Sequence, residues 1–395
     1  MRKSVCAMAA TICAAAMPVS AGELERLDAA ITGGEPIVDM RYRFESADDQ
    51  VNDPAQASTL RTRLGYETGD YHGFSVLGEM EDLSTIGNNR FAPVDPGYAV
   101  IADPPATVLN RAQIDYQGIT GLHATLGRQR IVIDNARHVG DVAWRQNNQT
   151  YDAARLRYGM FGFNLDYSHI RKVNAVNPAQ DDRVDHHLFR ASFHPVDALK
   201  VGYYGFFLDN EDGWESDTHG IDVRGEPRFL DRAWHYRLEF ARQRQDFNGD
   251  EFDPTYLLVQ GGTDVGPLGV TLAHEMLASD GGDAAFQTDL ATKHGFNGWA
   301  DVFLTTPAEG LVDTHLMLDT QLDGEVNLAL RYHRFRSDSG SLDYGNELNL
   351  QLTRSWGAYT LGAKMARFHA DEIDQVDNTP DDDVDRYWLW AEMKF

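Results

Sequence analysis

Apolar and polar side chains alternate with a period of two along most of this chain, as expected for β-strands whose two faces meet different surroundings. The carboxy-terminal stretch shows the alternation most clearly. Charged residues and two tryptophans occupy one parity, and the other parity holds Tyr387, Leu389, Ala391, Met393 and Phe395. The pattern therefore predicts that the chain ends in an amphipathic strand with one apolar face.

The same alternation predicts about eighteen strands in total. It is clear in the stretches 36–45, 58–67, 110–117, 161–168, 234–240, 347–352, 359–365 and 385–395. Weaker candidates lie near 73–82, 121–130, 150–158, 183–193, 198–208, 219–225, 255–262, 268–277, 311–320 and 325–336. So many short strands separated by turn residues indicate an all-β fold.

The connections between these strands alternate in length. Short ones rich in Gly, Pro and Asp follow every second strand, at 68–70, 118–120, 159–160, 194–197, 264–267, 322–324 and 355–357. The others are longer, at 46–57, 83–109, 131–149, 172–182, 209–218, 245–254, 278–310, 337–344 and 370–384. This alternation is typical of a transmembrane up-and-down antiparallel β-barrel with short periplasmic turns and long extracellular loops. A soluble β-sandwich, the alternative for any single strand, has no reason to place all its long loops at one end.

The amino terminus has the three parts of a secretory signal peptide. A basic start is followed by an apolar run over 4–17 and by small residues that predict cleavage after Ala21. Residues 1–21 are therefore expected to be a signal peptide, and residues 22–395 to form the barrel. Cys6 and Cys13 both lie in the signal, so the mature chain is predicted to contain no disulfide.

Composition narrows the class of protein further. Without Arg2 and Lys3, the mature chain has 33 basic and 61 acidic residues, a formal charge of −28. Such an acidic balance argues against a nucleic-acid partner, because phosphates require a basic face. Apolar residues make up 42% of the chain, yet no mature stretch reaches the length of a spanning helix. A closed barrel is then the one way to satisfy the backbone in a membrane, and the expected location is the bacterial outer membrane.

The polar faces of the predicted strands are rich in arginine. In a barrel these side chains project into the lumen, and the set is Arg41, Arg43, Arg61, Arg63, Arg111, Arg155, Arg157, Arg190, Arg237, Arg331, Lys364 and Arg386. Guanidinium groups stay charged and bind carboxylates in a bidentate way, so a pore lined by them selects anions. The alternative is that each arginine only pairs with an inward acid, such as Asp39, Glu45, Glu67, Asp115, Asp166 or Glu239.

Two loops have an unusual composition for exposed connections. The stretches 126–153 and 292–313 mix aromatic residues, amides and charges. Such a mixture allows a loop to fold into the lumen, to pack there and to pass a polar solute. Sugars also bind to this combination, since rings stack on Trp and hydroxyl groups meet Asn, Gln and Arg. The alternative is a loop that caps the barrel mouth.

Motifs in these two loops resemble those of the alginate-export-domain porins of the bacterial outer membrane. They are Gly127-Arg-Gln-Arg130, Trp144-Arg-Gln-Asn147 and Phe296-Asn-Gly-Trp-Ala-Asp301, the last followed by Thr306-Pro307 and Gly310-Leu311. The resemblance extends over the mature chain, and Phe395 resembles the terminal signal that the barrel assembly machinery reads in such proteins. This chain departs from the family by its shorter length and by Lys293, where an apolar residue is expected.

The resemblance implies an eighteen-stranded monomeric barrel whose arginine-rich constriction passes an anionic polysaccharide outward. The residues expected at the constriction or on the solute are Arg128, Arg130, Arg137, Arg145, Arg155, Arg157, Trp144 and Asn147. The lumen-facing basic residues expected around them are Arg41, Arg61, Arg63, Arg111, Arg237, Arg331 and Lys364. Asn297, Trp299 and Asp301 are expected to pack from the second loop into the lumen.

Motifs of common enzymes are missing, since the sequence contains neither a Gly-x-Ser-x-Gly elbow nor a His-Glu-x-x-His helix nor a phosphate loop. We therefore expect no enzyme, no metal centre and no cofactor. The leading hypothesis is passive passage of an acidic polysaccharide such as alginate. The alternatives are a substrate-specific porin for uptake of small anions or oligosaccharides, and a plugged structural or adhesin barrel. The expected surroundings are outer-membrane lipid and lipopolysaccharide. The acidic clusters of the loops are expected to be solvated, with binding of divalent cations or bridging of lipopolysaccharide as the alternative.

Overall fold

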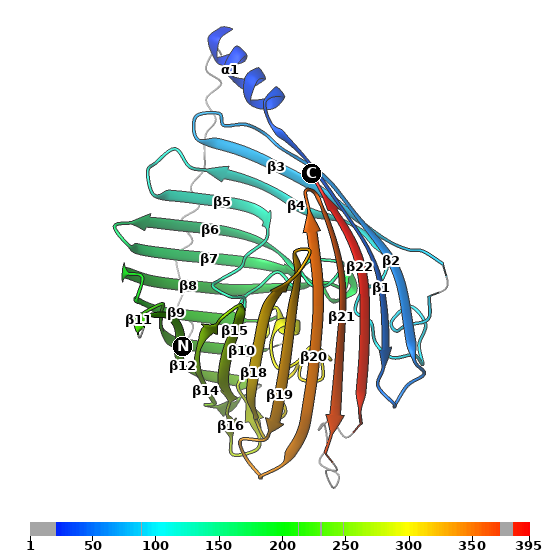
Figure 1. Ribbon diagram of the computed structural model, residues 1–395. Helices are drawn as coiled ribbons and strands as arrows, with labels where there is room; N and C mark the ends of the chain where they lie inside the picture. The colour runs from blue at the N-terminus through cyan, green and yellow to red at the C-terminus, as the bar shows by residue number, and fades with distance from the viewer. Residues whose placement is uncertain (1–20, 88, 212, 230, 248, 372–381) are drawn as a thin grey trace.

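The backbone of this protein closes into a single cylinder of strands (Figure 1). The structure is a computed structural model that describes residues 21–87, 89–211, 213–229, 231–247, 249–371 and 382–395. Within these residues, twenty strands belong to one antiparallel sheet. Two of them, β11 (Arg228–Phe229) and β13 (Asp250–Phe252), are short extensions of hairpins, which leaves eighteen barrel strands.

The barrel strands follow one another around the sheet in chain order. Their bounds are β1 Glu35–Asp48, β2 Ala55–Glu67, β3 Phe74–Thr85, β4 Ala106–Tyr116, β5 Leu122–Gln129, β6 Thr150–Met160, β7 Phe163–Asn174, β8 Asp182–Val196, β9 Leu199–Asp209, β10 Trp214–Gly225, β12 Arg232–Phe247, β14 Thr255–Val265, β15 Leu268–Leu277, β18 Leu311–Leu322, β19 Val326–Arg336, β20 Asp343–Trp356, β21 Tyr359–Ala370 and β22 Val384–Lys394. Short pieces complete the secondary structure: β16 Ser279–Asp280, β17 Ala284–Ala285, the 3-10 turns η1 Pro178–Gln180 and η2 Lys293–Gly295, and helix α1 Ala21–Thr32.

The last strand closes the barrel on the first. β22 pairs with β1 over ten residue pairs, from Asp39 opposite Lys394 to Asp48 opposite Asp385. Phe395 extends this ladder, because its N–H donates to the Val38 carbonyl at 2.8 Å and its carbonyl accepts from the Val38 N–H at 3.1 Å. The Phe395 ring itself is 66% exposed and lies edge-on to Tyr359. The predicted eighteen-stranded barrel is confirmed.

Connection lengths also follow the prediction, with the tight turns at one end of the barrel and the long loops at the other. Several boundaries were wrong. The predicted loop 209–218 contains the start of β10 at Trp214, and β8 continues to Val196 into the predicted turn 194–197. The strand expected from residue 161 begins at Phe163, because Phe161 and Gly162 form the turn with φ angles of 51° and 83°. Such left-handed backbone fits a two-residue hairpin turn but not a strand. The predicted loop 370–384 lies largely outside the described residues.

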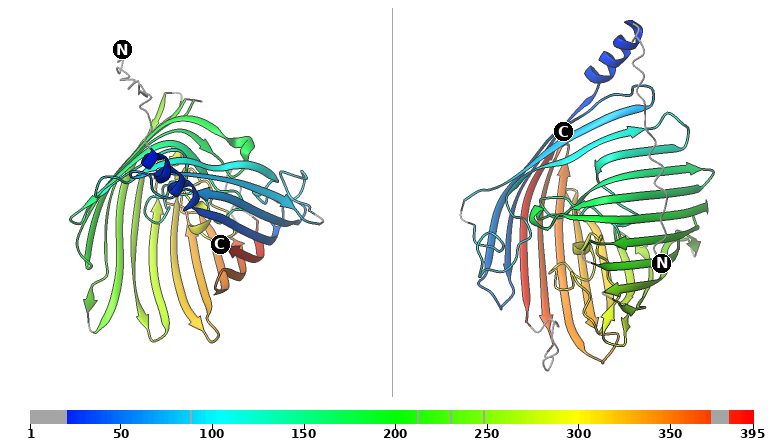
Figure 2. Two further views of the ribbon diagram at one scale, coloured as in Figure 1. Left: turned by 90° about the horizontal axis from the view of Figure 1, so that it is seen from above. Right: turned by 180° about the vertical axis from the view of Figure 1, so that it is seen from behind.

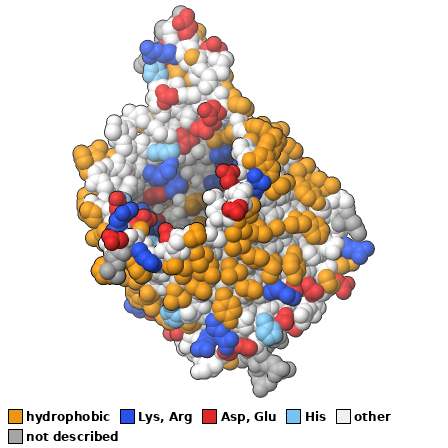
Figure 3. Space-filling model, viewed as in Figure 1, with side chains coloured by type: hydrophobic (Ala, Val, Ile, Leu, Met, Phe, Trp, Pro, Cys, Tyr) orange, Lys and Arg blue, Asp and Glu red, His pale blue; other side chains and the backbone are white. Residues whose placement is uncertain are grey.

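Alternation gives the wall an apolar outside and a polar inside. Leu126, Leu272 and Leu389 point outward and are 62%, 59% and 58% exposed. Arg43, Glu45 and other charged side chains of the opposite parity are buried in the interior. Figure 3 shows the result: hydrophobic side chains cover much of the outer wall, and charged side chains line the hollow at the mouth.

Helix α1 was not predicted. Its apolar residues Leu24, Leu27 and Ile31 recur at helical spacing, and all three side chains are exposed. Tyr71 Oη donates to Glu23 Oε2 at 3.0 Å, which holds the helix to the β2–β3 turn at the periplasmic end (Figure 2). Among the described residues, no helix is long and apolar enough to cross a membrane. The predicted signal peptide falls on residues that, apart from Ala21, lie outside the described part.

The inside–outside assignment predicts how arginine substitutions on the outer face depend on depth. Leu272 lies in the middle of β15, and Val265 ends β14 at the periplasmic rim. Leu272→Arg should lower the free energy of unfolding by about 2–4 kcal/mol, and the control Val265→Arg by at most about 1 kcal/mol, because burying a cation costs most at the bilayer midplane. Urea titration of the protein folded into lipid vesicles measures both, and equal small losses would contradict the assigned outer face.

Candidate functional site in the barrel lumen

Three long loops fold back into the barrel and cover part of its inner wall. They are the β3–β4 loop (86–105), the β5–β6 loop (130–149) and the β15–β18 loop (278–310). Each inserts apolar side chains that become fully buried, among them Phe91, Ile131 and Phe286. The last two loops were predicted to fold inward from their composition. The β3–β4 loop was not.

Arg145 is the point where all three loops meet. From the β5–β6 loop, its Nη1 lies 3.1 Å from Glu45 Oε1 on β1 and 3.7 Å from Asp103 Oδ2 of the β3–β4 loop. Its Nη2 donates to Asp301 of the β15–β18 loop. These four side chains are all nearly inaccessible to solvent. Buried carboxylates raise the pKa of Arg145, so the guanidinium stays charged and holds the loops together.

Two arginines of β1, Arg41 and Arg43, bind the same part of the β5–β6 loop from the barrel wall. Arg43 Nη1 donates to the Trp144 carbonyl, and its Nη2 contacts Asp103 and Glu45. Arg41 donates to the Gln146 side chain at 2.8 Å and to the carbonyl of Ala143 at 3.3 Å. The loop carbonyls need hydrogen-bond donors inside the barrel. These arginines supply them and also neutralise the buried carboxylates.

Arg137 connects the β5–β6 loop to the β15–β18 loop on the opposite side. Its Nε donates to Glu275 Oε1 on β15 at 2.7 Å, and its Nη2 donates to Asn297 Oδ1 at 2.9 Å. The guanidinium also lies over the Phe296 ring. Since Arg137 is only 2% exposed, it acts inside the packed loops and does not face a solute.

Lys364 of β21 occupies a cage of aromatic rings. Its Nζ lies 4.0 Å from the Trp144 ring centroid and 3.8 Å from that of Trp299. It donates to His294 Nε2 at 2.7 Å, and the His294 ring stacks on Trp144. Burial and the nearby Lys364 lower the pKa of His294 to about 3, so the neutral ring donates from Nδ1 to Asp301. The cage fixes both predicted loops on the wall.

The remaining predicted constriction residues lie on the wall formed by β3–β7. Arg130 contacts Glu79 at 3.1 Å, Arg155 donates to Asp166 at 2.9 Å, and Arg157 contacts His123. The side chains of Arg130 and Arg155 are 27% and 10% exposed, and Arg157 is also partly exposed.

Asn147 and Arg128 do not lie where they were expected. Asn147 is buried and donates to the Val176 carbonyl at 3.0 Å. Arg128 pairs in register with Ala112 and shares its parity with Leu126, so it lies on the outer face, where it binds Asp152. The expected placement of Arg128 at the constriction is therefore wrong, because strand alternation turns it out of the lumen.

The expected basic residues of the wall do face inward, and most are paired. Arg61 contacts Asp39 at 2.5 Å, Arg63 contacts Glu81, and Arg111 contacts Glu79 at 2.7 Å. Arg237 contacts Glu239 at 2.6 Å, and Arg331 contacts Asp319 at 2.6 Å. These contacts fit the alternative given in the sequence analysis, in which each arginine pairs with an inward acid. Of the acids named for that role, Glu67 is exposed instead.

Two basic residues that the sequence analysis did not select, Lys200 and Arg224, line a hollow of about 390 Å³ near the periplasmic end, together with the acids Asp197 and Glu226. Lys200 on β9 and Arg224 on β10 are register partners, and Arg237 joins them from β12. Arg224 binds Asp134, which reaches them from the β5–β6 loop. The parity of β9 and β10 could have identified both residues, since each shares a face with buried neighbours such as Asp222.

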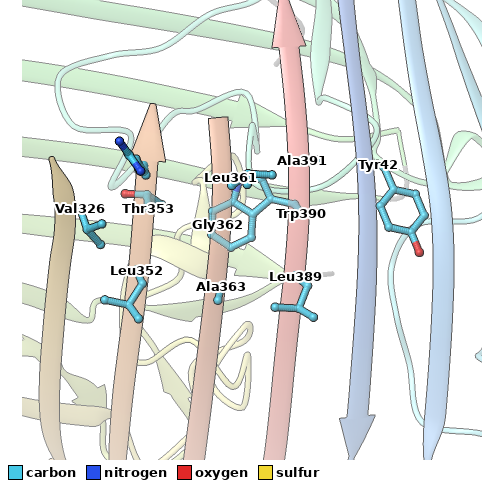
Figure 4. Close-up of a pocket in the computed structure, with 11 residues that line it drawn as sticks. Tyr42, Val326, Leu352, Thr353, Leu361, Gly362, Ala363, Leu389, Trp390 and Ala391 are labelled. Carbon is cyan, nitrogen blue, oxygen red and sulfur yellow. The ribbon is translucent and has the colours of Figure 1, made fainter. Parts of the chain in front are cut away.

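A hollow of about 450 Å³ on the outer wall is a different kind of site. It is a shallow groove lined by Leu352, Leu361, Ala363 and Leu389 (Figure 4). Its surface is apolar and faces the membrane, which suits a lipid chain rather than a charged solute.

Comparison with known proteins agrees with this architecture. The family model for alginate export matches residues 36–252, a range that includes the β5–β6 loop but not the β15–β18 loop. OccAB1 of Acinetobacter baumannii has a similar fold, with a TM-score of 0.70 and 14% identity over 93% of this chain and 98% of that one. OpdK of Pseudomonas aeruginosa, solved with vanillate, gives a TM-score of 0.68 and 12% identity over 92% and 99%. No curated protein matches the chain.

The central role of Arg145 predicts a channel that opens when this residue is removed. In Arg145→Ala, Glu45, Asp103 and Asp301 lose a shared cation, which should shift the loops toward an undocked state by about 3–5 kcal/mol. Single-channel conductance should rise, and protease should cut within 130–149 and 278–310.

The matched control is Arg367→Ala, which removes an exposed outer-face arginine paired with Asp385. Exposed pairs contribute little, so this variant should conduct like the wild type. Unchanged conductance and protected loops in Arg145→Ala would show that the docked loops do not depend on this contact.

Proposed function

The chain belongs to the alginate export family and forms a channel in the bacterial outer membrane, and on that premise we propose that it passes an acidic saccharide of the alginate class by diffusion. The family match and the polar interior of the barrel support this function. Uronate units carry one carboxylate each, and guanidinium and ammonium groups are the side chains that bind carboxylates.

The observation that carries the proposal is the basic wall at the periplasmic end. Four cations gather there, Arg190, Lys200, Arg224 and Arg237, around the carboxylates of Asp134, Asp222 and Glu239. Asp197 and Glu226 also line the open hollow, so its cations are balanced by acids and the site has no net positive charge. Lys200 and Arg224 line this hollow themselves, so their cationic groups are the ones that a passing anion would meet.

The predicted constriction residues divide into two roles in this proposal. Arg155 and Arg157 on β6 and Arg130 at the start of the β5–β6 loop have partly exposed side chains that could meet the solute. The other residues hold the loops that narrow the path, and they are Arg137, Arg145, Trp144, Asn147, Asn297, Trp299 and Asp301.

A second candidate is passage of a small organic acid. Three loops already occupy the lumen, and the hollows beside them measure about 210 and 600 Å³, which suits a small molecule better than a polymer. OpdK, whose fold is similar, was solved with vanillate, itself a carboxylate.

The route to the membrane is also part of the proposal. A signal peptide over residues 1–21 would direct export, and Phe395 would present the terminal signal to the barrel assembly machinery. The exposed Phe395 ring supports this role. We propose that the barrel is a monomer, since one chain closes the sheet by itself.

Block of current in a planar lipid bilayer tests the solute. The purified full chain should form an anion-selective pore, and an oligouronate should reduce its current in a concentration-dependent way, while a neutral oligosaccharide of the same length should not. Block by a small aromatic carboxylate alone would favour the second candidate. Absence of conductance would identify a plugged barrel and overturn the proposal.

Charge reversal tests the basic wall. Lys200→Glu together with Arg224→Glu changes the local charge by four units, so the reversal potential in a KCl gradient should move toward cation selectivity. The control Arg367→Glu places the same kind of change on the outer face and should leave the reversal potential unaltered. Selectivity that is the same in all three proteins would contradict a role for these residues.

A further inference from the structure

Two histidines and one aspartate converge on the inner wall where β18 and β19 run side by side. His315 and His333 are register partners across the two strands, and Asp313 lies two residues before His315 on the same face. The sheet therefore directs all three side chains into the same part of the lumen. The sequence analysis did not select this group, because Asp313 and His333 are twenty residues apart in the chain.

Their ligand atoms are already close to one another. Asp313 Oδ2 lies 3.2 Å from His315 Nδ1 and 3.0 Å from His333 Nδ1. All three ligand atoms lie within 4.8 Å of one another. In a tetrahedral zinc site with bonds of 2.0–2.2 Å, ligand atoms are separated by about 3.3–3.5 Å. Small side-chain movements would bring the group to that geometry.

One nitrogen of the group is poorly satisfied in the structure. His315 Nδ1 is buried and lies 3.2 Å from Asp313 Oδ2, but among the described residues it makes no hydrogen bond of good geometry. His333 Nδ1 donates to the Asp313 carboxylate. A buried polar atom without a partner is costly. An ion bound to both rings and the carboxylate would satisfy it.

The surroundings favour a cation at this point. Glu275 on β15 is the register partner of Asp313, and Glu347 on β20 is the register partner of His333. Three carboxylates therefore lie around the two imidazoles, which is compatible with a divalent ion.

Support for the carboxylate ligand comes from the loop that packs against it. Asn297 Nδ2 lies 3.3 Å from Asp313 Oδ2 and 2.8 Å from Glu275 Oε2. Such contacts orient a metal-binding carboxylate. The group also borders a hollow of about 210 Å³ lined by Trp299, Arg331 and both histidines. A fourth coordination position therefore opens toward the lumen.

We propose that Asp313, His315 and His333 form a binding site for one divalent transition-metal ion of the Zn²⁺ class in the wall of the lumen. Two imidazole nitrogens and one carboxylate oxygen form a donor set for zinc, with copper and nickel as close competitors. Calcium and magnesium prefer oxygen ligands alone and should bind poorly. The ion would connect β18 and β19 to the β15–β18 loop through Asn297.

A second cluster on the outer face provides a matched control. His169, Asp185 and His187 also bring their ligand atoms together, on β7 and β8. These side chains are between 34% and 49% exposed, and His187 Nδ1 already pairs with the Tyr167 hydroxyl at 2.8 Å. It lacks the burial and the poorly satisfied nitrogen of the lumen site.

Titration of the purified full chain in detergent with Zn²⁺, after removal of metal by chelation, tests the proposal. Calorimetry should give one tight site in the wild type and in the control His169→Gln with His187→Gln. The double variant His315→Gln with His333→Gln should weaken binding by at least 10–100-fold, since even indirect supports of a site contribute that much. Excess Ca²⁺ should not compete.

Cobalt provides a second readout of the same site. Co²⁺ bound to the wild type should give the visible absorption of a tetrahedral complex, and the lumen double variant should lose it while its far-ultraviolet circular dichroism stays that of a folded barrel. No Zn²⁺ binding by the wild type would overturn the proposal, as would loss of binding in the outer-face variant alone.

Discussion

Closure of the backbone hydrogen bonds is the constraint on which the rest of this structure depends. In hydrocarbon each unpaired N–H or C=O costs several kcal/mol, so a sheet in a membrane must have no free edge. β22 removes the edge of β1, and Phe395 continues the ladder to Val38. Once the sheet is closed, strand alternation sends every second side chain to lipid and every other one to the interior. The polar interior is therefore a consequence of closure.

The confined interior in turn requires that its charged side chains have partners. A guanidinium in a narrow, loop-filled lumen loses much of its water and needs an acid or a carbonyl nearby. Arg145 meets this need with Glu45, Asp103 and Asp301, which belong to a strand and two other loops. Because each partner comes from a different segment, one buried cation fixes the relative positions of all of them. The same contacts that neutralise the buried arginine therefore hold the loops in their folded position.

Local sequence was enough to predict the strands and two of the inward loops, but not the third loop. Period-two alternation and turn residues are properties of adjacent residues, so the strands and their order could be predicted. The inward fold of the β3–β4 loop could not, since Phe91 and Ile101 are scattered among polar residues without a period. Their burial depends on contacts with the distant strands β1 and β2 as well as with their own loop. Helix α1 carries a short apolar spacing that was overlooked.

In the lumen, too, the residues placed by strand parity could be predicted, and their partners in the loops could not. Arg41, Arg61 and Arg237 were assigned to the lumen by parity, and the structure places them there. Arg128 was selected from a motif, although the parity of Leu126 next to it already pointed outward. Partners such as Asp103 could not be found, because nothing in the sequence relates it to Arg145, forty-two residues later.

The division of arginines into buried and open ones bears on how such a channel can select a solute. Arg145 and Arg137 are almost inaccessible to solvent and their donors already meet partners in the loops and the wall, so they fix the loops and do not face a passing anion. In the proposed function, selection would come from wall residues that line open hollows, such as Lys200, Arg224 and Arg331. The loops then act by deciding which part of the wall a solute meets, and the closed sheet decides which side chains that wall presents.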